Sequence, residues 1–148
     1  MKKSNFLNIT LFLCLMFGFS ISDDLIRDYI NGEISTNSIQ FNSLSPNQNQ
    51  QVLLNGLSAI EGEKAKDYLV DYYYSDDDLY DDIASMKIAE YYYSIGSYLK
   101  SSNWYKIVAL DYENSEYANT AKTYYLNSLV IIGQKDSADF YTRKFQKK

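Results

Sequence analysis

The second half of the chain resembles itself when it is shifted by 37 residues. The segment 78–108 aligns without a gap on 115–145, with small residues on small ones and apolar residues on apolar ones, and Gly96 falls on Gly133. A weaker earlier copy spans 54–68. Self-similarity at such a period is the sequence signature of a repeat architecture, in which each unit packs on its neighbours.

Apolar residues within each unit recur every three to five positions, which is the period of a helix and not of a strand. The series are Tyr80, Ile83, Ala84, Ile88, Tyr91, Ile95 in one unit and Tyr117, Ala121, Tyr125, Leu129, Ile132 in the next. We expect Asp78 and Ser115 to be the N-caps of these two helices. Gly96 and Gly133 should end them, because glycine readily takes the left-handed conformation that follows a helix.

A second helix is expected after each of these glycines, over about 97–111 and 134–147. The residues expected to point inward are Leu99, Tyr105, Val108 in the former and Ala138, Tyr141, Phe145 in the latter. One helical hairpin cannot bury its own apolar face, whereas stacked hairpins share a core. The sequence therefore predicts an all-α fold, an α-solenoid of about three helix-turn-helix hairpins over 48–148.

The N-terminal residues 1–22 have the three parts of a secretory signal peptide. Two lysines precede an apolar stretch at 9–19, and small residues spaced as Ser-x-Ser follow it. The stretch is shorter than the roughly 20 residues that span a bilayer. Cys14 is preceded by Leu13 where a lipobox requires a small residue, so lipidation is disfavoured. We expect an exported protein, periplasmic or associated with an outer membrane, with no transmembrane span after cleavage.

A short helix and a polar linker are expected over 23–47. The residues 23–30 are amphipathic, and 33–47 are rich in Ser, Asn and Gln, a composition that buries little apolar area. The alternative for this segment is a docking strand built on Ile39, Phe41 and Leu44.

The composition excludes several classes of function. With no His among 148 residues, Ser-His-Asp and Cys-His catalysis and imidazole-bound zinc are impossible. No glycine-rich phosphate loop is present, and a net charge of −5 argues against nucleic-acid binding. A carboxylate pair such as Glu90 and Glu113 could support hydrolysis, but nothing in the sequence places the two at a cleft. We therefore expect no enzyme and no cofactor.

The acidic run over 76–82 is the one candidate metal site in the sequence. An EF-hand loop that begins at Asp76 requires Gly at its sixth position and Glu at its twelfth, where this chain has Asp81 and Lys87. The run is better explained as a turn between repeats, and no metal is predicted.

The segment 89–118 (AEYYYSIGSYLKSSNWYKIVALDYENSEYA) resembles a tetratricopeptide repeat. The units before and after it resemble the same repeat more faintly, so the likeness covers about 48–148. It is most similar to bacterial envelope members of that family, such as the periplasmic coordinator of the Tol–Pal system and the repeat lipoprotein of β-barrel assembly. The chain departs from the family pattern at three positions: it has Ser101 where the family has Ala, Glu113 where the family has Pro, and Thr142 where the family has an aromatic residue. Its period is 37 residues and not 34.

The resemblance implies an envelope scaffold that binds other envelope proteins or peptides. Its first helices would line a concave face that holds an extended peptide or a helix. Carried onto this chain, the contact residues are Met86, Glu90, Tyr93, Thr123, Asn127 and Val130.

The alternative function is binding of cell-wall peptidoglycan. The chain has 16 tyrosines, and those that are exposed would contact the glycan. Three consecutive helical residues cannot share one face. We therefore expect Tyr91 and Tyr92 in the core and Tyr93 exposed.

Overall fold

The structure is a computed structural model that describes residues 26–32 and 47–147. All regular secondary structure in these two ranges is helical, so the all-α prediction is confirmed. The expected signal peptide (1–22) and all of the expected linker except Asn47 lie outside the described residues.

The chain divides into two compact units, residues 1–47 and 48–148. In the first unit a short helix covers 26–30, within the expected range of 23–30. Gly32 follows it with φ +75° and donates a backbone hydrogen bond of 3.1 Å to the Tyr29 carbonyl.

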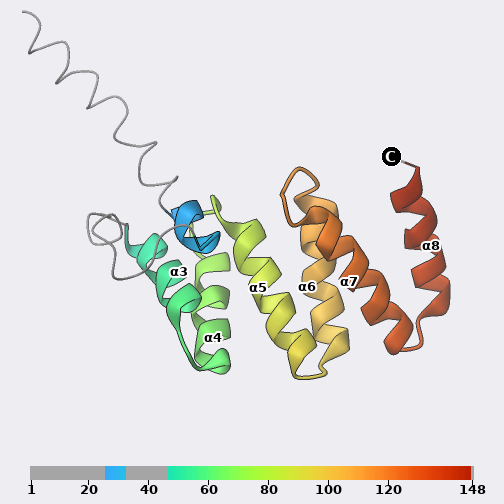
Figure 1. Cartoon of the computed structure of the whole chain (residues 1–148), viewed down its shortest axis with the longest axis horizontal. Helices are drawn as coiled ribbons and strands as arrows, with labels where there is room; N and C mark the ends of the chain where they lie inside the picture. The colour runs from blue at the N-terminus through green and yellow to red at the C-terminus, as the bar shows by residue number, and fades with distance from the viewer. Residues whose placement is uncertain (1–25, 33–46, 148) are drawn as a thin grey trace, which may run out of the picture. The chain divides into compact units, whose positions relative to one another are not determined.

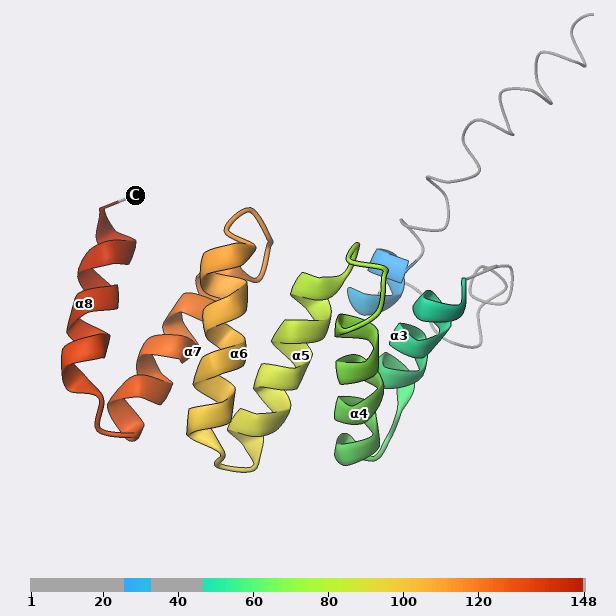
Figure 2. The ribbon, with the colours of Figure 1, turned by 180° about the vertical axis from the view of Figure 1, so that it is seen from behind.

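The second unit is a row of helices in chain order (Figures 1 and 2). They are α3 (Gln48–Ser58), α4 (Gly62–Tyr73), α5 (Asp81–Ser94), α6 (Tyr98–Asp111), α7 (Ala118–Ile131) and α8 (Lys135–Gln146). Each helix packs on the next one along the chain. Short turns join α3 to α4, α5 to α6 and α7 to α8, which gives three helical hairpins.

The hairpins recur with the period that the sequence predicts. Their second helices begin at Gly62, Tyr98 and Lys135, which are 36 and 37 residues apart. The fourth residue of each is small: Ala65, Ser101 and Ala138. A small side chain lets neighbouring helices approach closely; Ser101, fully buried, also donates a 3.1 Å hydrogen bond to the Ala89 carbonyl of α5.

Gly96 and Gly133 end α5 and α7 as predicted, with φ +75° and +79°. After α5, the amide of Ser97 donates to the Tyr92 carbonyl (2.8 Å) and the amide of Gly96 to the Tyr93 carbonyl (3.0 Å). The same pair of bonds recurs at Gly133. This is the Schellman arrangement, which requires a left-handed residue and so favours glycine.

The N-cap prediction was wrong, because α5 begins at Asp81 and α7 at Ala118. The carbonyls of Asp78 and Ser115 instead accept the amides of those two residues (3.3 and 3.1 Å) in a tight turn that precedes each helix. The Ser115 hydroxyl accepts the Tyr117 amide at 3.2 Å inside that turn, so it is not available to cap the helix.

A continuous core joins the second and third hairpins. Its buried members are Met86, Ala89, Tyr105, Val108, Ala109, Ala121, Tyr125, Leu129 and Ala138. Of the residues expected to point inward, Tyr105, Val108 and Ala138 are buried, and Tyr141 and Phe145 pack against the cluster. Ile95 and Leu99 are more than half exposed, which corrects their expected placement. Both lie at the α5–α6 turn, where the ends of the two helices extend past the core.

The aspartate run is used in hydrogen bonds that hold the loops. Tyr112 after α6 donates to Oδ2 of Asp81 (3.2 Å), and Ser115 donates to Oδ2 of Asp82 (2.6 Å). These bonds join the loop after α6 to the start of α5. Asp77 accepts from the Tyr72 hydroxyl at 3.1 Å. These contacts match the expected role of the run as a turn between repeats.

Tyr72 is fully buried, and its hydroxyl also accepts the amide of Tyr80 at 3.1 Å. Replacement by Phe should lower the free energy of unfolding by about 1–2 kcal/mol, because it leaves that buried amide without its acceptor. Urea unfolding measures the effect, with Tyr68→Phe on the exposed side of the same helix as the control. Equal stabilities of the two variants would contradict this role.

Candidate functional site

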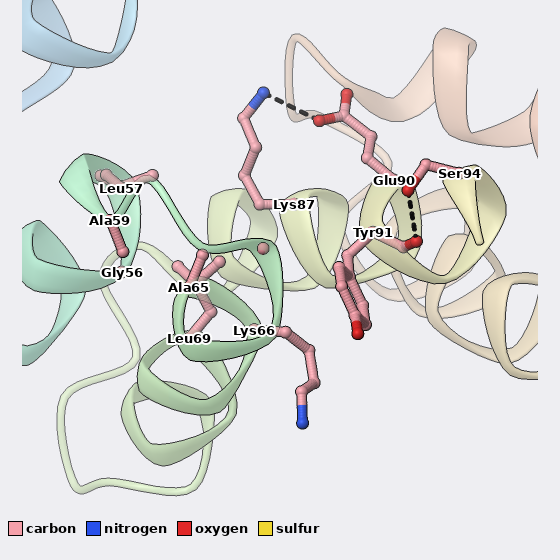
Figure 3. A pocket seen from close by; sticks show the side chains of 11 residues that line it. Gly56, Leu57, Ala59, Ala65, Lys66, Leu69, Lys87, Glu90, Tyr91 and Ser94 are labelled. Atoms are coloured by element: carbon pink, nitrogen blue, oxygen red, sulfur yellow. Dashed lines mark hydrogen bonds and ion pairs between the residues drawn. The ribbon is translucent and has the colours of Figure 1, made fainter.

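An open groove of about 470 Å³ lies between the first hairpin and α5 (Figure 3). Its walls come from the end of α3, the α3–α4 turn, residues 62–69 of α4 and residues 87–94 of α5. The lining residues are Gly56, Leu57, Ala59, Gly62, Ala65, Lys66, Leu69, Lys87, Glu90, Tyr91 and Ser94. Aliphatic side chains and a tyrosine ring make up much of this surface, while the charged groups are confined to three positions.

Two glycines let the walls of the groove approach closely. A Cβ at Gly56 would lie 2.8 Å from Cγ of Leu69 and 3.2 Å from the Ala65 carbonyl oxygen, so the bare backbone of Gly56 packs on the Leu69 side chain and the backbone of α4. A Cβ at Gly62 would lie 3.3 Å from the ring of Tyr91. The absence of side chains at these positions therefore determines how near α3, α4 and α5 come to one another.

The charged groups at the rim are paired with neighbours on their own helices. Lys87 Nζ lies 2.9 Å from Oε2 of Glu90 on α5. Lys66 pairs with Asp67 on α4, and the hydrogen bond to that carboxylate raises the pKa of Lys66. Partly exposed pairs of this kind exchange partners at little cost, since each contributes at most about 1 kcal/mol. The groove can thus offer both signs of charge beside an apolar wall.

Of the six predicted contact residues, only Glu90 lines the groove. Met86 is 2% exposed and belongs to the core, so its prediction as a partner contact was wrong. Tyr93 also packs against the core, with its ring centroid 5.0 Å from that of Tyr124 on α7. The reason is the same for both residues: they lie in or against the core that α5 shares with α6 and α7, on a face of α5 that the resemblance would leave open.

Thr123, Asn127 and Val130 form an exposed stripe on α7, at the positions equivalent to Met86, Glu90 and Tyr93. The structure thus splits the predicted set between two places. Val130 is more than half exposed, and Thr123 and Asn127 are exposed as well, so nothing in the described part of the chain buries this stripe.

The tyrosine triplet on α5 also differs from expectation. Tyr91, Tyr92 and Tyr93 are all half-buried, and Tyr93 is not the exposed member. The Tyr91 ring faces the groove (Figure 3), while Tyr92 lies under the ammonium of Lys100, 5.2 Å from its ring centroid. The third ring packs on α6 and α7, where aromatic edge-to-face contacts add to the burial.

Sequence reasoning missed most of the groove, although one signal for it was present. Gly56 stands inside α3, where glycine is unfavourable by about 1 kcal/mol relative to alanine. A glycine kept at such a position indicates close approach of another element, here Leu69. The residues opposite it on α5 have no comparable signal, because only the packing of hairpin on hairpin brings them near.

Comparison with protein-family models, with curated proteins and with solved structures finds no match to this chain. Within 26–32 and 47–147, no group of three or more acidic or cysteine side chains is arranged to hold a metal ion. No helix in the same ranges is long and apolar enough to cross a membrane.

Proposed function

We propose that this chain is an exported interaction scaffold of tetratricopeptide-like hairpins, and that the groove between the first hairpin and α5 holds a segment of a partner protein in the cell envelope. The observation that carries the proposal is the groove itself, which combines an apolar wall at Leu57 and Tyr91 with charges at Lys87 and Glu90. An open groove of this kind suits an extended peptide or an amphipathic helix, whose apolar side chains fill it while polar groups meet the rim.

The packing of the tyrosines favours a peptide over a glycan. Peptidoglycan binding through tyrosine requires exposed ring faces that lie together. The exposed tyrosines of the described residues are Tyr68 and Tyr74, on α4 and at its end, and Tyr124 on α7, where it stacks on Tyr105. No ring contact joins the α4 pair to Tyr124 in the described part of the chain, and most other rings are packed between helices.

Selection of peptides from a display library on the full chain, followed by affinity measurements, tests the proposal. Glu90→Trp would fill the groove and remove only a partly exposed ion pair. Asp71→Trp adds the same ring at an exposed position of α4 that does not line the groove. We expect the selected peptides to bind Glu90→Trp at least tenfold more weakly than the wild type, and Asp71→Trp with unchanged affinity.

Two results would contradict the groove as the site. One is a set of peptides that bind both tryptophan variants equally well. The other is a failure to select peptides together with sedimentation of the pure chain on protein-free sacculi, which would favour the glycan alternative.

A further inference from the structure

The three hairpin turns lie along one edge of the second unit, as the lower edge of Figures 1 and 2 shows. This tip edge consists of residues 58–62, 94–99 and 130–135, where α3 turns into α4, α5 into α6 and α7 into α8. The loops 74–80 and 112–117, which join one hairpin to the next, lie along the opposite, loop edge.

Exposed aliphatic side chains gather at the tip edge. Among the described residues, those with at least half of their surface exposed are Ile60, Ile95, Leu99, Val130 and Ile131, at 51–101%. Every hairpin turn contributes at least one of them. Ile60 is fully exposed, so burial within the described part of the chain does not account for an isoleucine at that position. Large apolar side chains that cluster on a surface indicate an interaction site.

The two edges also differ in charge. The second tip, 94–99, contains no charged residue, and the third has only Lys135. In the first tip Glu61 is paired with Lys64 at 2.9 Å. The loop edge is acidic through Asp76, Asp77, Asp78, Glu113 and Glu116. One edge is therefore apolar and nearly neutral, and the other carries a concentrated negative charge.

We propose that the tip edge inserts into the surface of a lipid bilayer, with the aliphatic side chains at the boundary between headgroups and acyl chains. The acidic loop edge would then face the water, where an anionic headgroup layer cannot repel it. The aliphatic residues project from convex turns and do not line a groove, so a rigid protein partner would need a matching series of hollows. A fluid bilayer needs none, and insertion at this depth requires no membrane-spanning helix.

Ala59, Gly62 and Ser94 of the tip edge also line the groove, but none of the five exposed aliphatic residues does, so lipid insertion and the proposed function depend on different side chains. Insertion should be driven by apolar burial, with a smaller electrostatic part because the tips are nearly neutral. We therefore expect binding to zwitterionic phosphatidylcholine vesicles as well as to vesicles with anionic phosphatidylglycerol, with little dependence on salt.

An environment-sensitive fluorophore on a single cysteine identifies the edge that meets the lipid. The label is placed by Leu99→Cys on the tip edge or Asp76→Cys on the loop edge, each combined with Cys14→Ser, which removes the sole native thiol. With either kind of vesicle we expect a blue shift of the emission at position 99 and none at position 76. Equal responses at the two positions would overturn the proposal.

Partition measurements with serine variants give the second test. Transfer of one aliphatic side chain from water into lipid changes the partition coefficient by about tenfold. Ile60→Ser, Leu99→Ser and Ile131→Ser should therefore each reduce vesicle binding by about that factor. Tyr74→Ser and Leu79→Ser change exposed side chains on the loop edge and should leave binding unchanged. Thermal midpoints check that all five variants remain folded.

The apolar stretch 9–19 has its own affinity for lipid, so each series is measured in the full chain and again after removal of 1–22. Equal losses in tip and loop variants would overturn the proposal. So would binding that requires anionic lipid and is abolished by salt, which would implicate the cations Arg143, Lys144 and Lys147 near the end of α8. The proposal would also be overturned if the chain did not bind vesicles but formed a dimer that the tip variants dissociate. That result would show that a second copy covers this edge.

Glu90→Trp should bind vesicles normally, which separates this test from that of the groove.

Discussion

Replacement of Tyr105 by alanine should lower the free energy of unfolding by about 3–5 kcal/mol, the range observed for removal of a large aromatic side chain from a core. Tyr105 is 1% exposed and lies where α5, α6 and α7 meet. Its ring stacks on Tyr124, with centroids 5.4 Å apart, and contacts the edge of Tyr93 at 6.2 Å. Its removal would therefore loosen the contact of two hairpins at once.

Urea denaturation followed by far-ultraviolet circular dichroism measures this effect. Tyr74→Ala is the matched control, since it deletes the same atoms from an exposed position at the end of α4. We expect the control to stay within about 0.5 kcal/mol of the wild type. Similar losses in the two variants would contradict the burial of Tyr105 in the core that α5, α6 and α7 share.

Acidification from pH 7.5 to 4.5 should strengthen the contribution of Asp81 to stability by about 1–2 kcal/mol. The pKa of Asp81 is raised from 3.8 to about 6, chiefly by burial; the Tyr112 hydrogen bond opposes the shift, and the charges of Asp78, Asp77 and Asp82 contribute to it. Between these two pKa values the folded chain binds more protons than the unfolded one, so stability falls as pH rises. Each pH unit between these two values changes stability by at most about 1.4 kcal/mol, and acidification to pH 4.5 crosses about 1.5 of them.

Asp81→Asn isolates this effect, because an amide of the same shape cannot titrate. One oxygen of Asp81, Oδ1, is buried without a hydrogen bond, which makes the charged form costly at neutral pH. The variant should gain stability relative to the wild type at pH 7.5 and lose that advantage by pH 4.5. Parallel stability curves for the two proteins over this range would contradict a buried carboxylate with a raised pKa.

The features that the sequence predicted correctly are those that local chemistry determines. The 37-residue shift located the starts of the second helices, because every unit must place the same small residue at the same turn. Gly96 and Gly133 were identified as helix ends, since a backbone conformation with positive φ favours glycine wherever it occurs. Tyr105 and Val108 followed from helical periodicity alone.

The errors concern positions whose surroundings come from distant parts of the chain. Met86 and Tyr93 were expected on an open face, and the sequence has no local mark showing that they pack in or against the core of the second and third hairpins. Asp78 was predicted as an N-cap because aspartate is common at that position. The tight turn that precedes α5 instead depends on the hydrogen bonds from Tyr72 to Asp77 and from Tyr112 to Asp81, which the sequence does not reveal. The groove depends on how the first hairpin meets α5, so only Glu90 among its members was predicted.

Site-specific photo-cross-linking in living cells that make the protein tests the central proposal, that the groove holds a partner polypeptide. A photoreactive phenylalanine analogue replaces Glu90 inside the groove, or Asn103 on the exposed surface of α6 as the control. We predict a discrete protein adduct from position 90, none from position 103, and loss of the adduct when Leu57→Asp places a charge on the apolar wall. Adducts of equal yield from both positions, or an adduct at position 90 that Leu57→Asp leaves intact, would contradict the proposal.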